Sequence, residues 1–347
     1  MEQSYYIFTS GELRRKDDSL VLINEKGKKD IPIERVYDLY IFSTVSINST
    51  LLSFLSQKGI CVHFYNYYDF YIGSFYPKET LVSGSLLVKQ VEKYQEYESR
   101  LLIAQQIIEA ASYNILRNLK YYNSRDKDLK QYIMQIEELR KEIYSTRNIS
   151  SLMGVEGNIR KVYYESWKII IDQDIDFEKT DEDIIFRIIQ ESITNALRHG
   201  HATEVKITLI SFMNTIIYTK TLSEIYRTQL NPTISYLHEP SDKRFSLCLD
   251  LSEVFKPLIV DRTIFSLLNK NMITENDFYT DDGGYYRMKD STIKVVVSAL
   301  ENTLTRSIKH KDLNRSVSYK HLIRLEAYKL IKHIIDEKIY EGFKIWW

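Results

Sequence analysis

The stretch that decides the fold is ESRLLIAQQIIEAASYNILRNLKYY, residues 98–122. Its apolar residues recur every three or four positions, and it holds neither glycine nor proline, which is the pattern of a long amphipathic helix. The pattern extends over residues 85–145, and helical periodicity dominates from there to residue 347. We therefore expect a large all-α domain over residues 85–347.

The chain before Pro77 has a different composition and residue pattern. It is rich in Tyr, Phe, Ile and Val in short runs that Gly or polar turns separate, which predicts strands. One helix is expected within residues 46–59, with Gly59 as its stop. The predicted fold class is α+β: a small N-terminal β domain over 1–76, a connector over 77–84, and the all-α domain. The runs predicted as strands are SYYIFTS (4–10), SLVLINEKG (19–27), KDIPIERVYDLYIF (29–42), CVHFYNYYD (61–69) and FYIGSFYP (70–77).

Composition narrows the class of protein. With 347 residues, 44% hydrophobic and 27% charged, the chain is typical of a soluble globular protein of two or three domains. Only Cys61 and Cys248 are present, which argues against a disulfide framework. No apolar run approaches the ~20 residues that cross a bilayer, and the N-terminus is polar from the start. We predict a cytoplasmic protein.

Formal net charge is zero, but the charges are unevenly distributed. Residues 172–191 are strongly acidic, and residues 303–333 are basic. A basic segment of this kind is either a phosphate-binding face or the solvated flank of a helix. The basic residues that we considered for DNA binding there are Arg306, Lys309, Lys311 and Arg315.

Glu156 lies between two glycines in SLMGVEGNIRKVYYESW, residues 151–167. The glycines permit a close approach of the backbone, and NIRKVYY continues as a helix. A carboxylate at such a helix entrance is well placed to bind a cation. The alternative is that Glu156 only stabilises the helix N-terminus.

A second set of polar residues lies in YLHEPSDKRFSLCLDLSEVFKPLIVDR, residues 236–262. His238 precedes Glu239 and Pro240, and the ordinary interpretation of such a histidine is a residue in a turn. Asp250 and Glu253 share one face of a mostly buried helix. Two like charges near a core are costly unless a cation lies between them. That cation is either a metal ion or one of three local basic residues, Lys256, Arg262 and Arg244, which are also candidates for DNA contacts.

Two carboxylates and one imidazole form an oxygen-rich site with one nitrogen. This set suits Mg²⁺ or Mn²⁺ and is typical of phosphoryl-transfer chemistry. Zinc fits less well, because no thiolate or second histidine has suitable spacing.

Three segments together carry a resemblance to a known family. They are LLSFLSQKGICVHFYNYYDFYIGSFYP (51–77), LMGVEGNIRKVYY (152–164) and the 236–262 stretch. In this order they resemble the CRISPR-associated adaptation integrases, the Cas-one family of metal-dependent DNA endonucleases, and the likeness spans nearly the whole chain. Where the family has a Ser-Phe-Gly element before the histidine, this chain has Met213 in place of glycine, and residues 172–210 are also atypical.

The resemblance implies that Glu156, His238 and Glu253 ligate the metal and that Asp250 supports the ligands or a second ion. It implies a homodimer through the β domain, with two dimers flanking a dimer of the small Cas-two partner. It also implies the reaction. A 3′-hydroxyl of a short DNA duplex, the prespacer, attacks a phosphodiester at the leader–repeat junction of a CRISPR array, and a second attack follows at the far end of the repeat.

Two other functions use the same sequence features. One is a metal-dependent nuclease that acts on branched DNA in repair. The other is a DNA-binding scaffold without catalysis, which has no need for an imidazole and three carboxylates at these positions. His199 and His201 are read as surface residues, because their spacing does not place them on one face of a helix.

Overall fold

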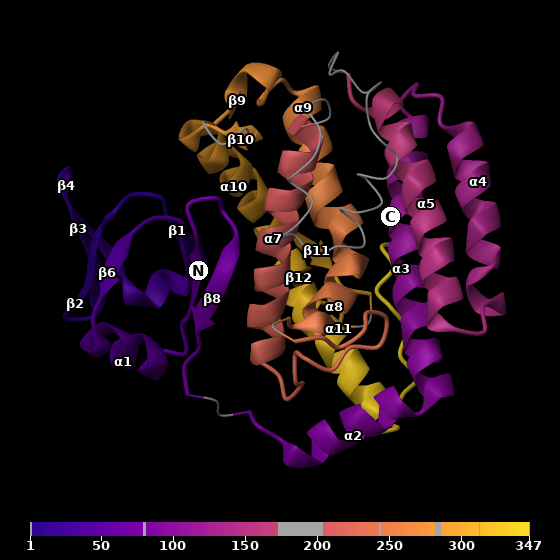
Figure 1. Cartoon of the computed structure of the whole chain (residues 1–347), viewed down its shortest axis with the longest axis horizontal. Coiled ribbons are helices and arrows are strands. Elements are labelled where there is room, and N and C mark those ends of the chain that lie inside the picture. The colour runs from indigo at the N-terminus through magenta and orange to yellow at the C-terminus, as the bar shows by residue number, and fades with distance from the viewer. Residues whose placement is uncertain are drawn as a thin grey trace. The chain divides into compact units, whose positions relative to one another are not determined.

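A computed structural model of the chain describes residues 2–78, 81–172, 204–242, 244–281, 286–311 and 313–346. The chain divides into two compact units, Met1–Val82 and Ser83–Trp347 (Figure 1). Strands dominate the first unit and helices the second, which confirms the predicted α+β class. The finer boundaries at 76, 77–84 and 85, and the role of the β domain in dimerisation, stay predictions.

The smaller unit holds two four-stranded sheets and one helix. One sheet has the order β4-β3-β2-β6, and the other has the order β1-β5-β7-β8. Within these two sheets, three neighbouring pairs are antiparallel, and the other three, β2 with β6, β1 with β5 and β5 with β7, run parallel. The strands are β1 (Gln3–Ile7), β2 (Gly11–Lys16), β3 (Ser19–Asn24), β4 (Gly27–Pro32), β5 (Val36–Ile41), β6 (Val45–Ile47), β7 (Cys61–Tyr65) and β8 (Tyr71–Phe75).

Helix α1 (Ser49–Gln57) completes this unit. Asn48 caps it, because the side-chain oxygen of Asn48 accepts the amide of Leu51 at 2.9 Å. Gly59 lies just beyond the helix end with φ of +68°, so the predicted stop is confirmed. The core draws on both sheets and on α1, and its fully buried members include Leu13, Leu39 and Leu55.

Sequence patterning missed two strands of this unit. Strand β2 reads GELRRK, and Leu13 is its only buried residue, so its composition gives no strand signal. Strand β6 has three residues and none of them is buried. The predicted run 29–42 is two strands, because Pro32 and a 3₁₀ turn at Ile33–Arg35 separate β4 from β5.

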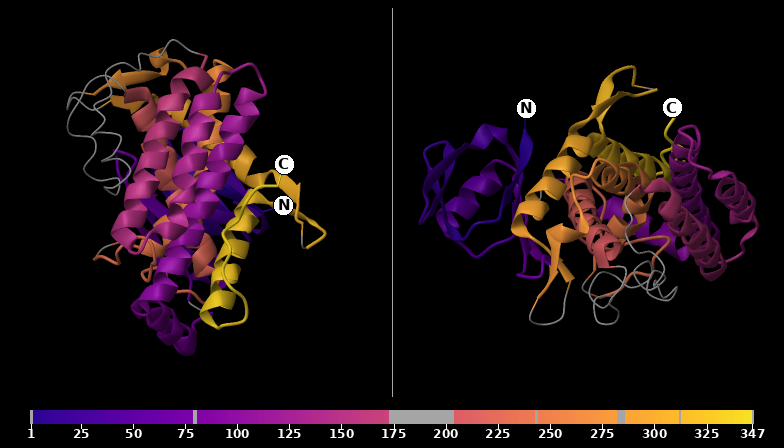
Figure 2. Two further views of the ribbon diagram at one scale, coloured as in Figure 1. Left: turned by 90° about the vertical axis from the view of Figure 1, so that its right-hand side faces the viewer. Right: turned by 90° about the horizontal axis from the view of Figure 1, so that it is seen from above.

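The larger unit is built around α3 (Tyr97–Asn123), the helix predicted from its periodicity. Helices α4, α5 and α8 pack on α3, and α7 packs on α8 and α11 (Figure 2). The other helices are α2 (Gly84–Gln95), α4 (Lys130–Lys141), α5 (Ile149–Ile170), α7 (Glu204–Tyr226), α8 (Ser246–Lys256), α9 (Arg262–Asn269), α10 (Asp290–Thr305) and α11 (Tyr319–Ile334).

Two short hairpins interrupt the helices and correct the prediction of an all-α domain. Strand β9 (Phe278–Thr280) pairs with β10 (Tyr286–Met288), and β11 (Ser307–Lys309) pairs with β12 (Ser316–Ser318). Three residues per strand are too few to show alternation, so pattern analysis does not detect them. The loop predicted at Gly283 and Gly284, between helices, lies outside the described residues, and strands flank it instead.

In the described part of the chain, no helix combines the length and the apolar character that crossing a membrane requires. The cytoplasmic location stays a prediction. The acidic segment after Asp172, with His199 and His201, lies outside the described residues. Met213 is fully buried in α7, where a side chain fills core space.

Candidate metal and nucleic-acid site

Helix α5 positions Glu156. The helix begins at Ile149, where the side chain of Asn148 accepts the amide of Ser151 at 2.7 Å. Gly154, Glu156 and Gly157 therefore lie inside the helix, and the prediction of a helix entrance at this motif is wrong. The entrance lies earlier because Asn148 is a strong N-cap, and a helical backbone accommodates both glycines. Glu156 is buried, with 7% of its surface exposed.

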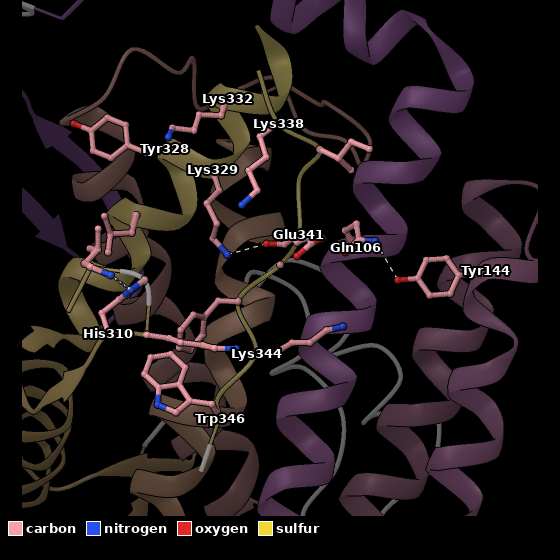
Figure 3. Close-up of a pocket in the computed structure, with 16 residues that line it drawn as sticks. Gln106, Tyr144, His310, Tyr328, Lys329, Lys332, Lys338, Glu341, Lys344 and Trp346 are labelled. Carbon is pink, nitrogen blue, oxygen red and sulfur yellow. Dashed lines mark hydrogen bonds between the residues drawn. The ribbon is translucent and has the colours of Figure 1, made fainter. Parts of the chain in front are cut away.

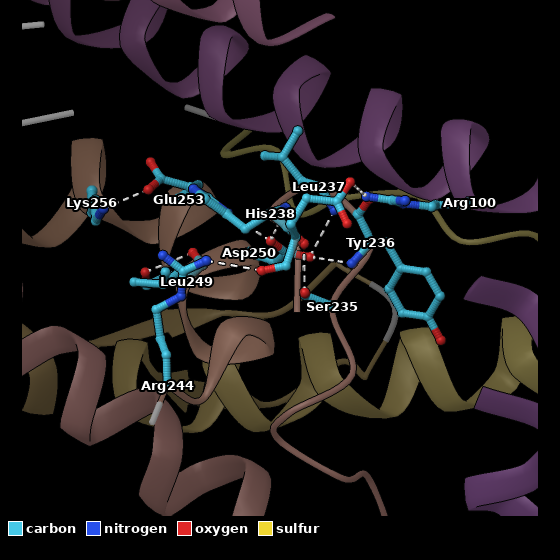
Figure 4. A network of polar contacts seen from close by, with 12 residues as sticks. Arg100, Ser235, Tyr236, Leu237, His238, Arg244, Leu249, Asp250, Glu253 and Lys256 are labelled. Atoms are coloured by element: carbon cyan, nitrogen blue, oxygen red, sulfur yellow. Dashed lines mark hydrogen bonds and ion pairs between the residues drawn. The ribbon is translucent and has the colours of Figure 1, made fainter. Parts of the chain in front are cut away.

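Asp250, on α8, holds the loop that carries His238. One carboxylate oxygen accepts the amides of Tyr236 at 2.6 Å and Leu237 at 2.9 Å. The other accepts the amide of His238 at 3.0 Å and lies 2.7 Å from its Nδ1. Figure 4 shows this carboxylate at the centre of the contacts. These four contacts use the acceptor capacity of a carboxylate, which has about four lone-pair sites.

The contact with Asp250 also fixes the tautomer of His238. A carboxylate accepts, so in the neutral form of the imidazole Nδ1 carries the proton and Nε2 holds the lone pair. A carboxylate that orients an imidazole in this way is the usual support of a metal-binding histidine. Asp250 is therefore a positioning residue, and the lone pair of Nε2 is the donor that remains.

The His238 loop is also fastened from α2 and α3. The buried amide of Gln90 donates to the carbonyls of Asn231 at 2.9 Å and Ile234 at 3.1 Å. Arg100 donates to the carbonyl of Tyr236 at 2.9 Å and pairs with Glu239 at 2.6 Å. These contacts come from segments more than 130 residues away in sequence, and they hold the imidazole against α8.

Arg160 joins the two glutamates. It lies one helical turn after Glu156 and forms ion pairs with both Glu156 and Glu253. All three are buried, with 5% of Arg160 and 6% of Glu253 exposed. Burial raises the pKa of Glu253, but Arg160, Lys256 and His238 outweigh it and hold that pKa at about 2. Arg160 is not among the residues predicted from the sequence, although its spacing of four from Glu156 places both on one helix face.

A further buried carboxyl, Asp261, lies in the π-helical turn Pro257–Asp261 that joins α8 to α9. Burial raises the pKa of Asp261 to about 7, against the opposing effects of Arg160 and a hydrogen bond with Tyr163. Asp261 thus takes up a proton near neutral pH. The carboxylate charge of the site rests on Glu156 and Glu253.

The donor set fits a hard divalent cation in its chemistry. Glu156 and Glu253 offer carboxylate oxygens to one shared cationic group. His238 lies near enough to Glu253 for a positive charge on its imidazole to lower the pKa of that carboxyl, and the neutral imidazole offers Nε2 as a donor. A formed cluster of three ligands is not found among the described residues. The guanidinium of Arg160 occupies the space between the carboxylates, so it stands in for the positive charge that two buried carboxylates require.

The three local basic candidates have different surroundings. Lys256 pairs with Glu253 at 2.5 Å, which confirms one partner that the sequence named. Arg244 donates to the carbonyl of Glu239 at 2.9 Å, at the rim of the His238 loop. Arg262 donates to Asn118 at 2.7 Å, and burial lowers the pKa of its guanidinium. Among the described residues, no ion pair joins Arg262 to Asp250 or Glu253, the two carboxylates for which the sequence made it a candidate partner.

The four basic residues farther along the chain lie together on one hairpin. Arg306 precedes β11, Lys309 ends it, and Lys311 and Arg315 belong to the connection to β12. All four side chains are exposed. The basic segment is therefore in part an exposed ribbon rather than the flank of a helix.

Comparison with known proteins identifies the family. The model of the family "CRISPR associated protein Cas1" matches residues 5–183 and 198–302. The chain belongs to the Cas1 family. It is 54% identical to a CRISPR-associated endonuclease Cas1 of Fusobacterium nucleatum, over 100% of this chain and 98% of that protein. The resemblance to the Cas-one family is thereby confirmed.

Solved structures agree with this assignment. A Cas1 protein from Thermotoga maritima is 36% identical, with a TM-score of 0.79 over 99% of this chain and 100% of that one. A casposase bound to an integration product has a TM-score of 0.81 at 17% identity, over 100% of this chain and 96% of that one. The second likeness concerns the fold alone. Relatives of this Cas1 are thus named as endonucleases, and its fold is shared with an enzyme captured after integration.

Proposed function

We propose that this Cas1 protein is a metal-dependent integrase that inserts short DNA duplexes into a CRISPR array by transesterification. Glu156, His238 and Glu253 hold the metal, and Mg²⁺ or Mn²⁺ suits their oxygen-rich donor set. When bound, the ion supplies Lewis-acid stabilisation of the charge that develops on the attacked phosphate and the leaving oxygen.

One observation carries the proposal. Asp250 uses all its acceptor sites on the His238 loop, while Glu156 and Glu253 direct theirs to a cationic side chain. Two helices that are far apart in sequence, α5 and α8, thus meet at one positive charge, and Asp250 of α8 holds the imidazole of His238. A purely structural ion network has no use for an imidazole oriented in this way.

The residues of this chain have distinct tasks in the proposed reaction. Asp250 keeps the proton of His238 on Nδ1, so the imidazole is ready as a ligand without reorganisation. Arg160 and Lys256 neutralise the carboxylates before the ion binds. Both stem from the helices that carry Glu156 and Glu253, so their charges stay next to the site when the ion takes their place at the carboxylates.

DNA and a small partner protein complete the proposal. A prespacer and the leader–repeat DNA are held by phosphate contacts, which need local positive charge rather than a basic net charge. Arg244 at the rim of the His238 loop and the exposed Arg306, Lys309, Lys311 and Arg315 are candidates for these contacts. Arg262 is a structural residue, since it is bound to Asn118. A homodimer and a dimer of the Cas-two partner are further parts of the proposed assembly.

The test is a joining assay with purified chain, the Cas-two partner, a plasmid with a CRISPR array and a short duplex with free 3′ ends. We expect joining at repeat borders with Mn²⁺ and none with EDTA. Glu156→Gln removes a metal ligand and should abolish joining. Glu165→Gln is the matched control, because Glu165 lies exposed on the same helix.

Three results would contradict the proposal. Joining that survives Glu156→Gln would show that this carboxylate is not a ligand. Metal-dependent cutting of branched DNA, without joining even when the partner is present, would instead support the repair nuclease. Binding of DNA with neither cutting nor joining would support a scaffold.

A further inference from the structure

A separate hollow lies in the larger unit, away from the residues of the metal site. Its volume is about 720 Å³, and its walls come from α11, the β11–β12 connection and the C-terminal segment 338–346, with Gln106 of α3 and Tyr144 at its edge (Figure 3). Neither Glu156, His238, Asp250 nor Glu253 lines it. The metal site therefore does not include this hollow, and of the residues that line it the proposed function gives a role to Lys311 alone.

The walls of the hollow are strongly basic. Five lysines line it, against the single carboxylate of Glu341. Lys329 is 2.7 Å from the buried carboxylate of Glu326, and Lys344 is 2.9 Å from Glu109. The other three, Lys311, Lys332 and Lys338, are exposed, and no ion pair ties them to any carboxylate in the described parts of the chain. Three ammonium groups are thus available to an anion.

Aromatic rings stand between the lysines. The ring of Trp346 is held at one side, with its centroid 5.9 Å from that of His310 and 5.8 Å from that of Phe343. It is still 39% exposed, and Tyr328 on α11 is 42% exposed. Lysines interleaved with half-exposed aromatic rings are typical of surfaces that bind single-stranded nucleic acid, since phosphates meet the cations and bases stack on the rings.

Buried contacts hold the C-terminal wall in place. Glu326 is fully buried, and one of its oxygens accepts the hydroxyl of Tyr340 at 2.7 Å and the amide of Phe343 at 2.9 Å. Lys329 donates to the carbonyl of Glu341 at 2.7 Å. The segment between these residues therefore has a fixed path along α11, and the hollow is a built feature of the fold.

We propose that this hollow binds a short single-stranded segment of DNA. A volume of 720 Å³ is in the range of small-ligand sites, ~300–1,000 Å³, so it admits roughly one to three nucleotides but not a duplex. Lys311, Lys332 and Lys338 contact the phosphates, and Trp346 and Tyr328 stack on bases. The inference rests on the proposed function in one respect, that the strand comes from the DNA which the enzyme joins.

The test measures binding alone, so it is independent of catalysis. A fluorescein-labelled oligothymidylate of about eight nucleotides, within the ~4–16 nucleotides that such surfaces cover, is titrated with the full chain, and its anisotropy is followed. Lys332→Glu with Lys338→Glu should weaken binding by about tenfold or more. Lys130→Glu with Lys168→Glu is the matched control, because both lysines are exposed in the same unit and the change in net charge is equal. We expect the control to change affinity less than about twofold.

Trp346→Ala separates stacking from charge. We expect it to weaken binding by about 5- to 100-fold, and Trp346→Phe to restore most of the affinity. Unchanged binding in the lysine pair overturns the site, and unchanged binding in Trp346→Ala overturns the assignment to nucleic acid. Displacement of the oligonucleotide by a polyglutamate peptide of equal charge at the same concentration also overturns it, in favour of an acidic peptide.

Failure of this proposal and failure of the integrase proposal give different results. Glu156→Gln should bind the oligonucleotide like the unchanged chain, because the hollow does not include Glu156. If joining never occurs but the lysine pair and Trp346→Ala weaken binding, only the integrase is refuted. If joining occurs and these variants bind normally, only the hollow is refuted.

Discussion

Replacing Arg160 tests the cation-binding argument most directly. This guanidinium is 5% exposed and lies between Glu156 and Glu253, which are 7% and 6% exposed. Burial lowers its pKa, but the two carboxylates outweigh burial and raise the pKa well above its ordinary value, so Arg160 is always charged. Arg160→Met removes the charge and keeps an unbranched apolar chain. Glu253 then keeps its ion pair with Lys256, while Glu156 loses its ion pair with Arg160.

The size of the effect follows from this burial. Removing one partner of a buried ion pair costs about 3–5 kcal/mol. Because Lys256 still pairs with Glu253, we expect the lower part of this range, a loss of about 3 kcal/mol in EDTA. A cation that binds between the carboxylates restores stability. At a Mn²⁺ concentration of 100 times Kd, binding to the folded state contributes about 2.7 kcal/mol. The unchanged chain should gain less, since Arg160 must first leave the carboxylates.

Urea unfolding followed by tryptophan fluorescence measures these free energies. All three tryptophans of the chain fall in the larger unit, so the signal reports on the unit that holds the site. The unchanged chain and Arg160→Met are compared in EDTA and in Mn²⁺. Arg140→Met is the matched control, because Arg140 pairs with Glu109 at 2.6 Å, away from the metal site. Its loss of stability should not be recovered with Mn²⁺.

Two outcomes would refute the reasoning. If Mn²⁺ stabilises the unchanged chain and Arg160→Met by equal amounts, Arg160 and the ion do not compete for the same carboxylates. If Arg160→Met costs less than about 1 kcal/mol in EDTA, the two glutamates are not the buried, charged pair that the geometry describes.

Three further changes test other parts of the structure. Asp250→Asn should weaken Mn²⁺ binding about 10- to 100-fold in calorimetric titration, because the amide cannot orient Nδ1 of His238 in the same way; unchanged affinity would contradict the role of Asp250. Asp261 has its pKa raised by burial from 3.8 to about 7, so its stability contribution is present below pH 4 and lost as pH rises towards 7. In the unchanged chain the unfolding free energy should therefore fall by about 1.4 kcal/mol per pH unit in this window, and Asp261→Asn should remove this fall. If the same pH dependence persists in the variant, Asp261 is not its source. Gly342→Ala would place a Cβ 2.5 Å from that of Ala110, so we expect a loss of about 1–3 kcal/mol in urea unfolding; no loss would mean that the C-terminal segment does not lie against α3.

Much of the fold could be predicted because the apolar residues of the long helices recur with the period of an α-helix. The core helix α3 has uninterrupted 3.6-residue periodicity, and its buried residues, such as Ile103, Ile107 and Leu119, follow that period. Strands β2 and β6 could not be predicted in this way. Their place in the sheet is set by pairing with β3 and with each other, which is a tertiary effect that their own composition does not reveal.

The sequence predicted which residues form the candidate site, but not their contacts. Helical spacing placed Asp250 and Glu253 on one face, and the resemblance to the Cas-one family grouped them with Glu156 and His238. It could not show that Asp250 faces the His238 loop while Glu253, one turn later on the same helix, faces Arg160. That difference depends on where α5 and the loop pack, and no local pattern in the sequence encodes it.

The two carboxylates of α8 show that the type of hydrogen-bond or ion-pair partner decides whether a carboxylate can exchange that partner for another cation. Asp250 is neutralised by N–H groups that belong to the folded backbone and to His238, and these donors cannot leave without unfolding the loop. Glu253 is neutralised by the ends of two flexible side chains, Arg160 and Lys256, which can withdraw when another cation arrives. Only the second arrangement is exchangeable. It is therefore Glu253, with Glu156 across the same guanidinium, that can pass from an internal cation to an external one.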